Sequence, residues 1–304
     1  MSKSLKRRVA LMCLFCLMIT SLCGAAFAAG EEDEEAVTEQ VIDYTPIPLY
    51  VDGIRVGDGF KVDATTYMPI RAFSEALRQE VTLEWDQETQ TVTVVLEPKT
   101  DEDGTPLTES LTVTATVGEQ YMVANDRYLY VPNGVLNLEG TVMVPIRELA
   151  KIFGVEIAWH DDTWSISIDS TELDILDPGA DFYVEDDLYW LSHIIHAESG
   201  NQPLEGMIGV GNVVLNRVAD PTCPDTIYDV IFDNRYGVQF SPTETGAIYD
   251  DPNEESIIAA KLCLEGYDVA GASLFFLNPE IGVSNWFAST RTYVATIGDH
   301  AFYA

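Results

Sequence analysis

The apolar residues in the last third of the chain recur with the period of a helix. The run Leu188 to Ile195 is mostly apolar, and a single carboxylate, Glu198, follows it just before Gly200. The pattern predicts three helices, over about Asp186 to Ser199, over Pro203 to about Val218, and from Asp251-Pro252 onward with an Asp cap and Pro in the first turn. The tail alternates around Gly298-Asp299, which predicts a β-hairpin.

The middle of the chain repeats a helix-and-strand pattern between Ile47 and Asp169. Pro69-Ile70-Arg71 recurs as Pro145-Ile146-Arg147, and Trp85 recurs as Trp159. Each unit predicts a helix that starts at Pro, followed by a strand, a polar turn and a strand of period two. The residues expected to face a core are Phe73 and Leu77 in the first unit and Leu149 and Phe153 in the second.

The first residues have the layout of a secretory signal. Basic residues precede the uncharged run Val9 to Leu22, and Ala26-Phe27-Ala28 has the small-x-small form of a signal peptidase site. We expect residues 1–28 to be removed and the protein to be exported. Leu22 before Cys23 argues against a lipoprotein anchor, and no later segment approaches eighteen continuous apolar residues, so no membrane insertion is expected after cleavage.

Composition changes mark the other expected boundaries. The acidic, aromatic-free tract "EEDEEAVTEQ" from Glu31 leads us to expect a flexible tether over residues 29–46. The repeats fill residues 47–170, a turn-rich connection with Pro178-Gly179 covers 171–185, and a separate domain covers 186–304.

The charge balance excludes one class of partner. The full chain has a net charge of −34, and loss of the signal leaves 12 basic and 50 acidic residues, a net charge of −38. Such a surface repels nucleic acid, and it requires that any long glycan be held by local hydrogen bonds. Two cysteines, Cys223 and Cys263, remain after signal removal, and the spacing leaves open whether they form a disulfide.

Glu198 is the candidate for chemistry. On a helical wheel it lies about 20° from Leu191 and about 40° from Ile194, so it faces inward. It also lies in the last turn of its helix, where burial and the helix dipole both disfavour the ionised form and raise the pKa. A carboxyl that keeps its proton near neutral pH is a general acid. The alternative, a buried acid that pairs with Arg217 or Arg291 or caps another helix, stays open on this pattern.

Two known families resemble parts of the chain. The repeats, through "PIR" and the "W-D/H-D" pattern, resemble the copper amine oxidase-like N-terminal domain, a stalk module of exported bacterial proteins. The resemblance implies duplicated strand-rich α+β stalk modules that space or anchor and can bind a wall polymer or a protein. No copper is expected, because His160 is the only histidine there. Arg71 and Arg147 are interpreted as ties between helix and sheet rather than as glycan ligands.

The C-terminal motifs "HAESGNQPLEGMIGVGNVVLNRV", "VQFSP", "FFLNP" and "IGDHAFY" resemble the spore cortex-lytic, SleB/CwlJ-type cell-wall hydrolases. The resemblance implies an α+β chain whose C-terminal domain is lysozyme-like, helical with a small β part. It also implies that Glu198 is catalytic. The family writes this motif "YAEARGE"; here His196 replaces the tyrosine and Gln202 the second acid.

The implied activity is peptidoglycan cleavage between N-acetylmuramic acid and N-acetylglucosamine, in the spore cortex during germination or in the vegetative wall. A lytic transglycosylase needs one acid, which acts first as acid and then as base, whereas most glycosidases need two carboxyl groups. Glu205 and Glu244 are the available second acids. Substrate contacts are expected from Gln239, Ser241, Asn278 and Arg291, with Trp286 as a weaker candidate, and no cofactor is expected.

Three alternatives remain open. The first is an N-acetylmuramoyl-L-alanine amidase that uses a metal held by His193, His196 and Glu198, with His300 as another ligand, although the His-x-x-His-x-Glu spacing is not the His-Glu-x-x-His signature. The second is a Cys/His amidase that uses Cys223 or Cys263. The third is an inactive wall-binding scaffold, which would be expected to lack the acid that this chain retains at Glu198.

Overall fold

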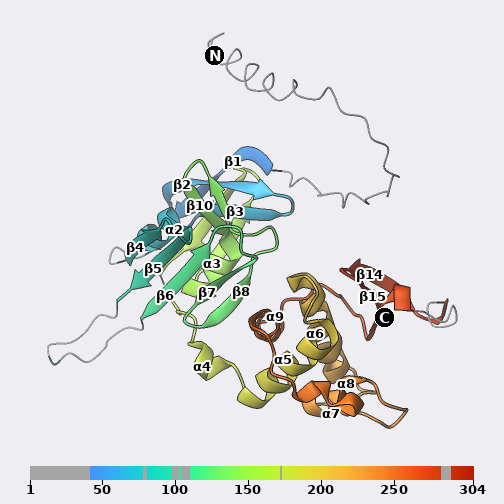
Figure 1. Ribbon diagram of the computed structural model, residues 1–304. Coiled ribbons are helices and arrows are strands. Elements are labelled where there is room, and N and C mark those ends of the chain that lie inside the picture. The colour runs from blue at the N-terminus through green and yellow to red at the C-terminus, as the bar shows by residue number, and fades with distance from the viewer. Residues whose placement is uncertain (1–41, 78–80, 98–102, 104–109, 172, 282–288) are drawn as a thin grey trace, which may run out of the picture. The chain divides into compact units, whose positions relative to one another are not determined.

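The computed structural model describes residues 42–77, 81–97, 103, 110–171, 173–281 and 289–304 (Figure 1). The predicted signal peptide, nearly all of the predicted tether and Trp286 lie outside the described residues. The described residues form a mixed α+β fold, as expected.

Two sheets make up the strand-rich region, residues 42–169. The larger has the order β11-β12-β1-β2-β3-β10-β9, and the smaller runs β4-β5-β6-β7-β8 (Figure 1). The strands are β1 (Ile42–Val51), β2 (Ile54–Val62), β3 (Thr65–Pro69), β4 (Val81–Asp86), β5 (Thr91–Leu96), β6 (Leu111–Thr116), β7 (Tyr121–Ala124), β8 (Arg127–Tyr130), β9 (Leu136–Leu138), β10 (Thr141–Pro145), β11 (Glu156–His160) and β12 (Ser165–Asp169).

Each Pro-Ile-Arg triplet leads from a strand into a short helix, as predicted. The helices are α2 (Ile70–Leu77) and α3 (Ile146–Phe153). The four residues predicted to face a core are all buried, and the rings of Phe73 and Phe153 lie 5.6 Å apart between centroids. The strands that precede the two helices pair with each other, with Pro69 opposite Met143, Met68 opposite Val144 and Tyr67 opposite Pro145.

The first strand begins earlier than the sequence pattern indicated. β1 starts at Ile42, whereas residues 29–46 were expected to be a tether. Ile42 and Asp43 lie opposite Val62 and Lys61 of β2. The acidic tract ends before this segment, and Ile42, Tyr44 and Thr45 are residues that favour strands once β2 supplies the pairing partner.

The C-terminal region is built on three helices that pack against one another. They are α5 (Glu185–Ser199), α6 (Leu204–Ala219) and α9 (Glu254–Leu264), and they confirm the three predicted helices. The cap of α9 differs from the prediction: Asn253, not Asp251, accepts a hydrogen bond from the Ser256 backbone N–H at 2.9 Å. The shorter elements are α4 (Gly179–Phe182), α7 (Ile227–Ile231), α8 (Pro242–Thr245), η1 (Ala247–Tyr249) and η2 (Pro279–Ile281).

A close helix contact depends on one glycine. A Cβ on Gly211 of α6 would lie 2.6 Å from the Cys263 sulfur of α9, which is too close for any side chain. Cys263 is buried, burial raises the pKa of its thiol, and both it and Cys223 are free thiols. The disulfide that the sequence left open is therefore not formed. The buried, protonated sulfur of Cys263 packs between the helices and is not a nucleophile.

The predicted hairpin at the end of the chain is present. β14 (Tyr293–Ile297) and β15 (His300–Tyr303) pair around Gly298, and β13 (Phe275–Leu277) completes a sheet of order β13-β15-β14. Gly298 has φ of 55°, the left-handed conformation that such a tight turn favours. Phe302 of β15 is fully buried near the α6 residue Val213. Within the described residues, none of the helices combines the length and apolar character needed to cross a membrane.

Glu265, just after α9, is the centre of a buried ion cluster. Arg127 of β8 donates two hydrogen bonds to its carboxylate, one of them at 2.7 Å, and Lys151 of α3 donates one at 2.9 Å. The Tyr183 hydroxyl donates a further bond at 2.9 Å. The Glu265 side chain is 0% exposed and that of Arg127 is 6% exposed. Burial alone would raise the pKa of Glu265, but the two cations offset burial and hold it below its usual value.

We predict that Glu265→Ala lowers the free energy of unfolding by about 3–5 kcal/mol, because it leaves the buried Arg127 guanidinium without its carboxylate. A depressed pKa stabilises the fold above the unfolded-state pKa of about 4.3 and loses that effect as pH falls through the folded-state value. The difference in unfolding free energy between the parent and Glu265→Ala should therefore become smaller in acid. Urea unfolding at several pH values measures it. Glu255→Gln on the exposed face of α9 is the matched control, and an equal loss there would contradict the assignment.

Candidate functional site

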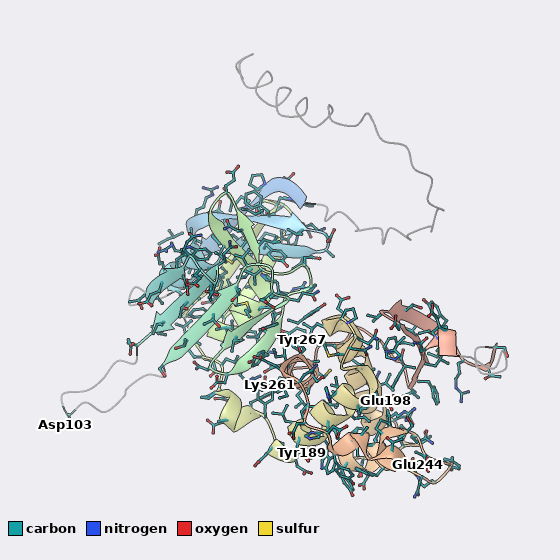
Figure 2. All side chains as sticks on the ribbon, viewed as in Figure 1. Asp103, Tyr189, Glu198, Glu244, Lys261 and Tyr267 are labelled. Atoms are coloured by element: carbon teal, nitrogen blue, oxygen red, sulfur yellow. The ribbon has the colours of Figure 1, made fainter. Side chains whose placement is uncertain are left out.

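The predicted acid lies in a pocket formed by distant segments. Glu198, in the last turn of α5, shares a cavity of about 320 Å³ with the loop before α8 and with a ring from β13. Figure 2 marks Glu198 and Glu244, which come from α5 and α8. The described residues that line it are Glu198, Arg217, Val238, Gln239, Phe240, Ser241, Glu244 and Phe276.

The electrostatics of Glu198 agree with the prediction. Burial raises the pKa of its carboxyl, and no charge contributes to that shift. The described residues provide neither a hydrogen-bond donor nor an ion-pair partner for this carboxyl. The alternative in which Glu198 pairs with Arg217 is therefore wrong, although the two side chains line the same cavity. A carboxyl removed from water with no cation beside it favours the protonated form, which general acid catalysis requires.

Arg217 is the functional candidate that the sequence analysis missed. The residue is 9% exposed, and its Nε donates a hydrogen bond of 2.8 Å to the Leu274 carbonyl. Its guanidinium also lies 5.1 Å from the ring centroid of Phe240 and 5.4 Å from that of Phe275. Burial lowers its pKa, although guanidinium remains charged in proteins. With Nε occupied, the outer N–H groups are the donors left for the cavity.

A helical pattern in the sequence does point to Arg217. Val210, Val213, Val214 and Arg217 are spaced as i, i+3, i+4 and i+7, so the arginine lies on the apolar stripe of α6. This is the same signal that identified Glu198: a charge on a face that otherwise packs in the core.

Two of the predicted contact residues line the pocket. Gln239 and Ser241 flank Phe240, which is buried and anchors the loop. The Gln239 amide donates a 2.8 Å hydrogen bond to the Gly237 carbonyl, and Ser241 precedes Pro242 at the start of α8. The exposed Glu244 is the one other carboxylate among the described lining residues.

The other predicted site residues are not among those that line the pocket. Glu205, the possible second acid, accepts a 2.5 Å hydrogen bond from the Tyr130 hydroxyl in the first turn of α6. Asn278 accepts a hydrogen bond from the Glu280 backbone N–H at 2.9 Å and so shapes the turn after β13. Arg291 lies 4.4 Å from the ring centroid of Phe275.

The histidines that suggested a metal site face different neighbours. His193 is buried, its Nδ1 lies 2.7 Å from the Tyr189 carbonyl, and its ring packs on that of Tyr189 at 4.0 Å between centroids. His196 Nδ1 lies 3.4 Å from the Asn253 backbone N–H. Within the described part of the chain, His, Cys, Asp and Glu side chains form no group of three that could hold a metal ion.

Comparison with known families follows the division between the two regions. Residues 201–303 match the Cell Wall Hydrolase family. The C-terminal region carries a cell wall hydrolase domain. The matched range begins three residues after Glu198, so the acid itself lies just outside it. Residues 51–168 match the Copper amine oxidase N-terminal domain in one continuous range that includes both Pro-Ile-Arg triplets.

Relatives of the cell wall hydrolase domain are spore cortex-lytic enzymes. Those of Oceanobacillus iheyensis and Bacillus cereus are 32% and 33% identical over 120 residues, which is 40% of this chain and 42% and 45% of the relatives. The chain thus spans less than half the length of these curated relatives. The catalytic domain of the germination-specific lytic transglycosylase SleB from Bacillus anthracis is 32% identical, with 42% of this chain and all of that one covered and a TM-score of 0.37.

We predict that Glu198→Gln stabilises the fold at neutral pH by about 1 kcal/mol, because it removes the cost of a buried, unpartnered carboxylate. The pKa of Glu198 is raised in the folded state. Below the unfolded-state pKa the carboxyl is neutral in both states and costs no stability, and stability is lost as pH rises through the folded-state pKa. The gain should therefore vanish near pH 4, measured by thermal unfolding across pH. A variant less stable than the parent at neutral pH would contradict the burial of an ionisable acid.

Proposed function

We propose that the protein is an exported peptidoglycan-cleaving enzyme, a lytic transglycosylase that cuts between N-acetylmuramic acid and N-acetylglucosamine. The observation that carries the proposal is the Glu198 carboxyl, whose pKa is raised by burial in a cavity where none of the described cations pairs with it. The cell wall hydrolase match supports the substrate class. The name shared by the curated relatives, spore cortex-lytic enzyme, supports a role in cortex lysis during germination.

The proposed reaction uses the same side chain twice. Glu198 donates its proton to the glycosidic oxygen, the bond from that oxygen to the muramic acid C1 breaks, and N-acetylglucosamine leaves as an alcohol. The Glu198 carboxylate then takes the proton of the muramic acid 6-hydroxyl, whose oxygen forms a bond to C1. The product carries a 1,6-anhydro ring, no water is consumed, and Glu198 returns to its acid form.

The surrounding residues fit a saccharide. Gln239 and Ser241 offer uncharged donors and acceptors for hydroxyl and acetamido groups. The outer N–H groups of Arg217 are suited to a substrate carbonyl or carboxylate. Glu244 is exposed in α8, lines the same cavity, and is the residue that a hydrolytic, two-carboxylate reaction would use.

The proposal includes the organisation of the whole chain. A signal at 1–28 and an acidic flexible tether precede duplicated stalk modules within 47–170, a linker at 171–185 and a lysozyme-like catalytic domain at 186–304. The pairing of β3 with β10 supports the duplication, because equivalent residues of the two units exchange places across it: Tyr67 lies opposite Pro145, and Pro69 lies opposite Met143. Peptidoglycan strands are the proposed partner, with a further wall polymer or protein on the stalk.

We predict that Glu198→Gln lowers turnover of peptidoglycan by about 10²–10⁴-fold, the usual contribution of a positioned general acid. Glu185→Gln, at the exposed first turn of the same helix, is the matched control and should retain full turnover. Mass spectrometry of digests of cortex and of vegetative wall, made in heavy-oxygen water, identifies the bond and the preferred polymer.

The product distinguishes the chemistries. A transglycosylase gives anhydromuropeptides without the heavy label, whereas hydrolysis places the label at the new reducing end. Intact glycan strands that have lost their peptides would instead show an amidase. Full turnover by Glu198→Gln would overturn the assignment of the acid.

We predict that Arg217→Lys, which keeps the charge but loses the planar fork of donors, raises KM for soluble glycan fragments by roughly tenfold, in line with the loss of one charged hydrogen bond. The kcat should fall less than it does in Glu198→Gln. Steady-state kinetics separates the two parameters. An unchanged KM with a kcat as low as that of Glu198→Gln would show that Arg217 acts on the proton transfer rather than on binding.

A further inference from the structure

A second cavity in the strand-rich region has the features of a ligand site. It measures about 520 Å³ and lies where the β2–β3 turn, the start of α3 and the β11–β12 hairpin meet. Its polar and aromatic lining includes Lys61, Thr66, Arg147, Trp159, Asp161 and Trp164. This cavity, termed the Trp159 pocket below, falls within the size range of small-molecule sites.

Two tryptophans form an exposed aromatic wall of this pocket. The rings of Trp159 and Trp164 lie 5.1 Å apart between centroids, edge to face at 77°. Trp159 is 42% exposed and Trp164 is 57% exposed. The Trp159 indole N–H donates a 2.7 Å hydrogen bond to the Asp161 carboxylate, which fixes the ring while leaving much of it in solvent. Exposure of a large apolar ring to water is unfavourable in free energy, and it does not help the fold itself.

The backbone conformation of Trp164 also indicates that its side chain is kept for binding. Trp164 has φ of 50°, the left-handed region that bulky residues rarely occupy and that a hairpin turn usually gives to Gly or Asn. The same turn position in the first unit, Gln90, has φ of 55° and carries no ring. The turn therefore does not require an aromatic residue. A strained residue whose side chain is mostly exposed indicates that the side chain is kept for contact with something else.

The charges of the pocket oppose those of the chain. Lys61 and Arg147 are exposed, and the described residues offer neither of them an ion-pair partner, in a protein with a net charge of −34. In the first unit the equivalent Arg71 is paired instead with Glu75 at 3.3 Å. Two cations free to bind, on a surface where acids outnumber bases about threefold, fit an anionic group.

The first unit supplies an internal comparison. A cavity of about 420 Å³ there is lined by Arg71, Glu75 and Trp85 at the corresponding positions. The Trp85 indole N–H bonds to Gln87 at 3.1 Å, as Trp159 does to Asp161. The described lining of this cavity includes neither a second tryptophan nor an unpaired cation. The two cavities therefore share their position in the repeat and the hydrogen-bonded tryptophan, but not the other binding groups.

We propose that the Trp159 pocket binds a saccharide unit that carries a carboxylate. The apolar C–H face of a pyranose ring packs on an indole, Trp159 and Trp164 together give a corner for one ring, and Arg147 and Lys61 bind the carboxylate. The choice of a muramic acid glycan as the probe rests on the proposed function, whereas the site itself does not. The enzyme then holds its polymer at two places, the Trp159 pocket and the Glu198 pocket.

The test uses the full chain with Glu198→Gln, which blocks turnover. Calorimetric titration compares a tetrasaccharide of alternating N-acetylglucosamine and N-acetylmuramic acid with the uncharged N-acetylglucosamine tetramer. Two classes of site are expected for the first probe. Trp164→Gly and Trp159→Ala should each weaken one class by at least about tenfold, and Trp85→Ala, the matched control, should change neither. Arg147→Met should remove the preference for the charged probe, and Arg71→Met should not.

Stability separates binding from folding. Glycine suits the left-handed turn, so Trp164→Gly should not lower the Tm, and a clear loss of Tm would make Trp164 structural and overturn the proposal. Unchanged isotherms in Trp159→Ala and Trp164→Gly would also overturn it, as would equal losses in Trp85→Ala. Equal affinity for both probes, unaffected by Arg147→Met, would overturn the acidic ligand class. Turnover of short soluble fragments is compared separately between the chain that retains Glu198 and Glu198→Gln, so a failure of the catalytic assignment is distinguished from a failure of the Trp159 pocket.

Discussion

The site depends on a carboxyl that is kept out of water without a cation beside it. Glu198 lies in the last turn of a helix that buries Leu191, Ile194 and Ile195, and its raised pKa has burial as its one cause. Arg217 lines the same cavity but is held by the Leu274 carbonyl and lies between two rings, so it does not neutralise the acid. An ion pair there would stabilise the fold and would remove the proton that the proposed reaction needs. The arrangement favours chemistry at the expense of stability.

A second glutamate in the chain shows how far the surroundings decide this outcome. Glu265, like Glu198, follows an apolar helix and comes just before a glycine. Its pKa is lowered, because Arg127 and Lys151 bind its carboxylate. These cations stand 138 and 114 residues away in the chain. Both acids stand at the end of a helix shortly before a glycine, and the distant partners separate a structural ion pair from a candidate general acid.

This comparison explains which parts were predictable. Helices α5 and α6, the final hairpin and the inward face of Glu198 follow from periodicity, because each is a local property of its segment. The early start of β1 depends on a partner strand, and the fate of Cys263 depends on the approach of two helices at Gly211. Among the residues expected to contact substrate, Gln239 and Ser241 line the pocket, whereas Asn278 is not among its lining residues and its side chain accepts a hydrogen bond within a turn. Motifs identify which loops matter more reliably than which atoms face the cavity.

The charge of the chain limits how it can hold a wall polymer. With a net charge of −34, the long-range field opposes the approach of an anionic glycan, so attraction must come from short-range contacts inside cavities that the field does not dominate. The cations that are free to act in this way occupy such positions: Arg217 lies in the Glu198 pocket, and Arg147 and Lys61 lie in the Trp159 pocket. By contrast, Arg71, Arg127 and Lys151 are already paired with carboxylates. The few basic side chains therefore divide into those that are paired with carboxylates and those that are left for a ligand.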